Sequence, residues 1–180
     1  MIWVILLLLS NMLQGTQNDS LGSHSYYNRE MGFRLELPGS WTGNVYTQEK
    51  DGRTVFMYKS VSGNEDAEVM SIFLITPIQF KIHDAHVGFY REISERNGLI
   101  VAAFLPTGVP YDNTLISQQK DYAHFFEVFA SVNSVLATFL LQPGFDQSLY
   151  YRVLEEGALK DETYREEYER ILKAEKAAQE

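Results

Sequence analysis

The stretch TVFMYKSVSGNEDAEVMSIFLIT, residues 54–76, predicts the centre of the fold. It holds two apolar runs, residues 54–61 and 69–76, on either side of the turn-forming tripeptide Ser62-Gly63-Asn64. A short turn between two strands favours antiparallel pairing. The second run is almost continuously apolar, which is typical of a strand in the middle of a sheet.

The segment before this stretch predicts two further strands. Residues 32–38 read GFRLELP, in which apolar and charged residues alternate with the period of a half-buried strand. Pro38 ends this strand, and residues 41–48 predict the next one. Asp51-Gly52 is a hairpin dipeptide, so we expect the strand over residues 41–48 to pair with the run that follows.

Downstream of residue 76 the apolar spacing becomes helical. Four ring or apolar side chains of residues 84–97 recur at this spacing: His86, Phe89, Tyr90 and Ile93. The pattern predicts a helix that Asp84 caps and Asn97-Gly98 ends. Residues 99–105 (LIVAAFL) predict another buried strand, and residues 106–114 a loop.

The longest helical pattern covers residues 117–141. Eight apolar side chains fall on one stripe: Tyr122, Phe125, Phe126, Phe129, Val132, Leu136, Phe139 and Leu140. This predicts one amphipathic helix laid on a sheet, and the polar residues inside the pattern exclude a transmembrane helix. We therefore expect an α+β body over residues 25–142, followed by a charged helical tail over residues 143–180.

Residues 1–15 resemble a secretory leader, and residues 16–24 form a polar linker. The apolar run at residues 2–9 would rise about 12 Å as a helix, too short for a bilayer core of about 30 Å. Its length suits the apolar part of a signal peptide, although no Lys or Arg precedes it. The alternative is a buried N-terminal strand or helix. We expect an exported protein, extracellular or associated with the cell envelope, with no membrane span in the mature chain.

Composition excludes several classes of function. The chain of 180 residues has a formal net charge of −9 and shows no basic stripe, so we expect no nucleic-acid partner. It contains no Cys, which rules out disulfides, thiolate metal sites and Cys nucleophiles. The sequence also lacks a phosphate-binding loop and a dinucleotide fingerprint, and we expect no cofactor.

The opening of the body resembles a known family. Tyr26-Tyr27-Asn28 followed by GFRLELPGSW at residues 32–41 is similar to the start of small exported proteins of Gram-positive bacteria and, more distantly, of the PsbP family. The resemblance covers about residues 25–141 and implies an αβα sandwich with an antiparallel sheet. It carries over no catalytic residue. Ser10 and Asn11 stand where the bacterial relatives often have a lipid-anchoring Cys.

Two sets of residues are weak candidates for a site. His83, Asp84 and His86 form the one clustered metal-type set, since residues three apart share a helix face. The alternative is an N-capping Asp between partly exposed His residues. Four aromatic residues could line a ligand groove, although such residues more often form cross-strand core pairs: Trp41, Tyr46, Phe56 and Tyr58.

Three functions remain open from the sequence. The leader, the acidic body and the lack of catalytic motifs favour a non-catalytic binding or accessory module with a protein or small-molecule partner. A hydrolase that uses His and carboxylates is the second alternative, and oligomerisation through the tail is the third.

Overall fold

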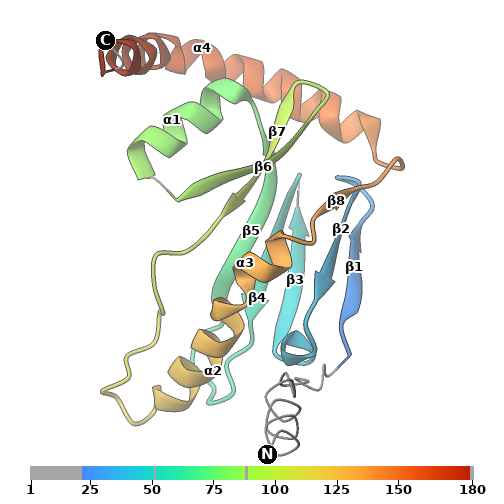
Figure 1. The fold of residues 1–180 in the computed structure, drawn as a ribbon, viewed down its shortest axis with the longest axis vertical. Helices are drawn as coiled ribbons and strands as arrows, with labels where there is room; N and C mark the ends of the chain where they lie inside the picture. The colour runs from blue at the N-terminus through green and yellow to red at the C-terminus, as the bar shows by residue number, and fades with distance from the viewer. Residues whose placement is uncertain (1–21, 51, 88, 179–180) are drawn as a thin grey trace, which may run out of the picture.

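The computed structural model describes residues 22–50, 52–87 and 89–178, in which the strands form two antiparallel sheets (Figure 1). The five-stranded sheet contains, in spatial order, β3 (Val45–Lys50), β4 (Arg53–Tyr58), β5 (Ala67–Ile75), β7 (Leu99–Phe104) and β6 (Tyr90–Arg96). The three-stranded sheet contains β1 (His24–Asn28), β2 (Phe33–Leu37) and β8 (Leu140–Leu141). The helices are α1 (Pro77–Val87), α2 (Gln119–Ala130), α3 (Val132–Leu136) and α4 (Gln147–Ala178). This architecture confirms the predicted α+β fold with antiparallel sheets and a C-terminal helix.

The predicted centre of the fold is confirmed. β4 and β5 pair antiparallel, and β5 is the middle strand of the larger sheet. The turn between them contains Gly63, whose φ of 78° lies in the left-handed region that favours glycine. The strands predicted at residues 32–38 and 99–105 are also present, as β2 and β7.

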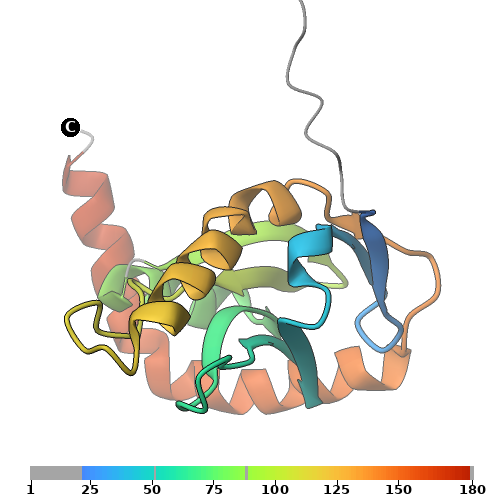
Figure 2. The ribbon, with the colours of Figure 1, turned by 90° about the horizontal axis from the view of Figure 1, so that it is seen from below.

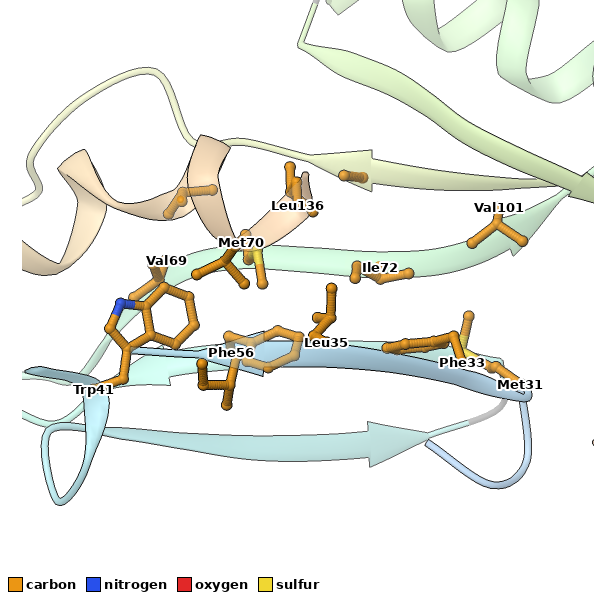
Figure 3. Packing of buried hydrophobic residues seen from close by; sticks show 14 of the residues in the cluster. Met31, Phe33, Leu35, Trp41, Phe56, Val69, Met70, Ile72, Val101 and Leu136 are labelled. Atoms are coloured by element: carbon orange, nitrogen blue, oxygen red, sulfur yellow. The ribbon is translucent and has the colours of Figure 1, made fainter. Parts of the chain in front are cut away.

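The main core lies between the inner face of the five-stranded sheet and a layer made of the three-stranded sheet, α2 and α3. Figure 3 shows Leu35 of β2, Phe56 of β4 and Ile72 of β5 pointing into this layer. Trp41 closes one end, where its ring meets that of Phe56 edge-on at 5.9 Å. Burial of each such side chain contributes about 1.5–3 kcal/mol, so the main core supplies most of the stability of the body.

The prediction of one helix over residues 117–141 is wrong at two points. The helix breaks at Ser131, which separates α2 from α3. The Ser131 hydroxyl donates to the Val128 carbonyl at 2.7 Å and accepts from the Trp41 indole at 2.8 Å. It therefore contacts a core residue at the point where the helix breaks. The final residues, Leu140–Leu141, form β8 and pair with β2.

The helix predicted at residues 84–97 is also wrong. A helix does precede this region, but it begins at Pro77, and Thr76 caps it by accepting from the Gln79 amide at 3.2 Å. Of the predicted range, residues 84–87 are the end of α1, whereas residues 90–96 are β6, which forms a hairpin with β7. Asn97 and Gly98 have φ of 53° and 78°, the combination that a two-residue hairpin turn requires.

The strand predicted at residues 41–48 begins later than expected. Gly39–Trp41 form a short 3-10 helix, and β3 starts at Val45. The predicted hairpin to β4 is present, with Gly52 at a φ of 74°.

α4 crosses the ends of the strands and lies beside α1 (Figure 1). Figure 2 shows the strands between α2 and α3 on one side and α4 on the other. Leu149 and Tyr150 of α4 are part of the main core, and the Tyr150 hydroxyl donates to the Met31 carbonyl at 2.7 Å. Further along α4, Asp161 accepts from Thr76 at 2.6 Å and from Gln79 at 3.1 Å. Thr76 and Gln79 thus fasten α1 to α4.

The leader predicted at residues 1–15 and most of the predicted linker lie outside the described residues. Within the described part of the chain, no helix combines the length and the apolar character that crossing a membrane requires.

Candidate functional site

The outer face of the five-stranded sheet, which is turned away from the main core, carries a group of aromatic residues. Cross-strand partners share a face in an antiparallel sheet. The register therefore places Arg53 beside Phe73, Ser71 beside Phe104, and Phe104 beside Tyr90. α1 covers one end of this face, where Phe80 packs against three residues: Ile75, Ile100 and Ala102.

Next to α1 the outer face is hollowed into what we call the aromatic groove, about 430 Å³ in volume. Six of its lining residues matter here: Arg53, Ser71, Phe73, His83, Tyr90 and Phe104. The Tyr90 ring is at the centre of the group, with its centroid 5.5 Å from that of Phe73, 5.4 Å from that of Phe104 and 5.2 Å from that of His83. These rings are only partly buried, so their faces and edges are available to a ligand.

A second hollow, which we call the acidic hollow, lies beyond Phe104 and has a volume of about 560 Å³. The loop before β5 contributes Glu65 and Asp66 to it, and the start of β5 contributes Glu68. Tyr111 forms part of another wall, held by a hydrogen bond from its hydroxyl to the Glu65 carbonyl at 2.7 Å. Phe104 lines both hollows, so the two are neighbours.

Charges of both signs meet between the two hollows. The Arg53 guanidinium lies 3.3 Å from the Glu68 carboxylate and 3.3 Å from the Ser71 hydroxyl. Asp66 is held by the Tyr46 hydroxyl at 2.9 Å and the Ser60 amide at 2.9 Å. The Arg53 side chain is half exposed, so its ion pair with Glu68 is weak and a ligand can compete for it.

The structure separates the two His residues of the candidate metal set. His83 stacks on Tyr90 in the aromatic groove, whereas the His86 imidazole lies 3.5 Å from Glu167 of α4. Asp84 is exposed. Burial, together with the nearby His86, lowers the pKa of His83, which favours its neutral form at pH 7. Among the described residues, no group of three or more His, Asp or Glu side chains is placed to hold a metal ion.

The ligand groove that the sequence predicted from four other aromatic residues does not form. Trp41, Phe56 and Tyr58 are at most 1% exposed and belong to the main core, whereas Tyr46 is 36% exposed. Tyr46 pairs with Met57 on the outer face of the sheet, and Phe56 and Tyr58 alternate with Met57 on β4, so they point inward. The alternative interpretation, cross-strand core packing, holds for Phe56 and Tyr58, whereas Trp41 packs in the core from a 3-10 helix.

A buried carboxylate lies below the acidic hollow. Asp121, at the start of α2, is 0% exposed and accepts four hydrogen bonds. The donors are the Tyr58 hydroxyl at 3.1 Å, the Ser60 hydroxyl at 2.9 Å, the Val61 amide at 2.7 Å and the Asn64 side-chain amide at 2.7 Å. Burial opposes ionisation, but these hydrogen bonds outweigh it and lower the pKa of Asp121 to about 2. Asp121 therefore anchors the loop that forms the wall of the acidic hollow.

Apart from His83, which was a candidate metal ligand, sequence reasoning did not find the residues that line the two hollows. One signal was available: Asn97-Gly98 is a hairpin dipeptide, and interpreting it so would have placed Tyr90 on a strand beside Phe104. No comparable signal marks Asp121, because its partners are about 60 residues away in the chain. Comparisons of this chain with protein-family models, with curated proteins and with solved structures gave no match.

Proposed function

We propose that this protein is a non-catalytic binding module and that it binds its ligand on the outer face of the five-stranded sheet. The observation that supports this proposal is the aromatic groove, in which the partly buried rings of Phe73, Tyr90 and Phe104 line a hollow beside α1. Partly exposed rings that gather in a concave site, rimmed by polar groups, are a common feature of ligand-binding surfaces.

The polar groups of the groove favour binding over catalysis. The Ser71 hydroxyl accepts from the Arg53 guanidinium, and the His83 imidazole stacks on a tyrosine ring. A nucleophile needs a base within hydrogen-bond distance, and a base needs a group that orients it. In the described residues that line the groove, neither Ser71 nor His83 has such a partner, so their geometry suits contacts with a ligand.

This proposal is tested by fragment screening with amide NMR spectra of the protein. We expect fragments that contain an aromatic ring to shift the amide signals of Ser71, Phe73, Tyr90 and Phe104. Phe104→Ala should weaken these fragments about tenfold, because one ring contact contributes about 0.5–1.5 kcal/mol.

Phe126→Ala is the matched control, since Phe126 is an exposed aromatic residue of α2, a helix that covers the opposite face of the sheet. It should leave fragment affinity unchanged. Fragments that bind elsewhere, or that bind the Phe104→Ala variant equally well, would contradict the proposal.

We also propose that the module acts outside the cytoplasmic membrane, on the basis of the signal-like residues 1–15. Expression of the full chain in a bacterial host, followed by fractionation and N-terminal sequencing, tests this. The expected result is an exported protein that has lost its first residues. Full-length protein confined to the cytoplasm would contradict it.

A further inference from the structure

We propose that the ligand of the outer face is an extended, positively charged peptide segment of a partner protein, with an apolar side chain over Phe104. This inference rests on the proposed function and names the ligand class for the same site. Its basis is the position of the aromatic groove and the acidic hollow, which are neighbours and share Phe104.

The charges around the two hollows favour a cationic ligand. Three acidic residues line the acidic hollow: Glu65, Asp66 and Glu68. Glu92 adds a further exposed carboxylate on the outer face, where it pairs with Ala102. Among the described residues that line the groove, Arg53 is the one Arg, and it is already paired with Glu68. The surface around the two hollows is therefore net negative, and complementary charge steers a basic partner to it.

The same charges argue against other occupants. A second copy of this chain would bring a net charge of −9 to an acidic face, so self-association through this face is opposed. An anionic lipid surface is repelled for the same reason.

The shape of the site favours a peptide over a compact molecule. Two open hollows in a row, with a shared aromatic residue between them, are suited to a chain that lies along the face. In an extended peptide, alternate side chains point the same way and residues advance by about 3.3 Å each. A basic residue two positions from an apolar one would therefore reach the acidic hollow while the apolar side chain contacts Phe104.

Fluorescence polarisation with three labelled peptides tests the inference. The peptides are Lys-Ala-Phe-Ala-Lys, the variant without an aromatic ring Lys-Ala-Ser-Ala-Lys and the acidic variant Glu-Ala-Phe-Ala-Glu. We expect the first to bind, the second to bind about tenfold more weakly because it lacks the ring contact, and the third to show no binding. Added salt should weaken the first peptide, since exposed charges are screened.

Two charge-reversal variants of the protein localise the effect. Glu65→Lys changes an exposed carboxylate of the acidic hollow and should weaken the basic peptide about threefold to tenfold. Glu155→Lys makes the same charge change at an exposed position of α4, on the helix face opposite the buried Gly157, and should have little effect.

The outcomes distinguish this inference from the proposed function. If aromatic fragments bind the groove in a Phe104-dependent way but the acidic peptide binds as well as the basic one, the inference is overturned and the binding function stands. The same conclusion follows if no peptide binds at about 1 mM, a range in which weak specific contacts are still detected. If Phe104→Ala changes neither fragment nor peptide affinity, both proposals fail.

Discussion

Replacing Asp121 with Ala should lower the free energy of unfolding by about 3 kcal/mol, because four donors around the buried carboxylate lose their acceptor. The buried Tyr58 hydroxyl and the Val61 amide then lose their charged partner. Urea unfolding at pH 7 measures the change. Asp121→Asn should also destabilise, since its amide group presents hydrogens to donors where the carboxylate presents an oxygen.

The effect of Asp121 should depend on pH in a defined direction. The folded-state pKa, about 2, lies below the ordinary value of 3.8, so the ionised form stabilises the fold. This contribution is fully present above about pH 5 and is lost as the pH falls through the folded-state pKa. The difference in unfolding free energy between the native protein and Asp121→Ala should therefore shrink by about 2 kcal/mol between pH 5 and pH 2.

Asp112→Ala is the matched control for Asp121. Asp112 is an exposed carboxylate that accepts hydrogen bonds from Thr114 in the loop before α2. Its removal should change stability far less, because water replaces the lost contacts. A stability difference for Asp121→Ala that stays constant down to pH 2 would show that the carboxylate does not stabilise the fold through its charge.

The parts of the fold that could be predicted from the sequence are those with an unbroken local pattern. β2 alternates apolar and charged residues, and β5 and β7 are continuous apolar runs, so their periods identify them without knowledge of their partners. The turns at Gly52 and Gly63 can also be predicted locally, because glycine is the residue that favours the positive φ which both turns require.

The predictions were wrong where a segment fits two local patterns, or where contacts with distant residues determine its secondary structure. His86, Phe89, Tyr90 and Ile93 satisfy a helical spacing, but Tyr90 pairs with Phe104 of β7, and Ile93 lies at an irregularity within β6. Ser131 lies within the range of the predicted helix, yet its hydrogen bond to Trp41, 90 residues earlier, coincides with the break between α2 and α3. The candidate site is harder still, because β4, β5, β6, β7 and α1 each contribute residues to the groove, and the sheet order that brings them together is non-local.

Gly157→Ala should destabilise the protein by about 2 kcal/mol, although the same change at an exposed helix position would stabilise it by about 1 kcal/mol. Gly157 is buried where α4 crosses the end of β5, and a Cβ there would stand 2.4 Å from Thr76 Cγ2. That distance forces α4 to move, and the cost of overpacking exceeds the gain in helix propensity. Ala158→Gly, at the exposed neighbouring position, is the control and should destabilise by about 1 kcal/mol through propensity alone.

A second substitution assigns the effect of Gly157→Ala to one contact. Thr76→Ser removes Cγ2 but keeps the hydroxyl that donates to Asp161 and caps α1. The double variant should regain most of the lost stability, with a coupling of about 1–2 kcal/mol in a double-mutant cycle. Hydrogen exchange should show that Gly157→Ala alone also loosens the amides of α1, because Thr76 and Gln79 hold that helix to α4. Since α1 carries His83 into the aromatic groove, loosening of α1 should weaken fragment binding there, whereas an unchanged groove would mean that α1 keeps its place without α4.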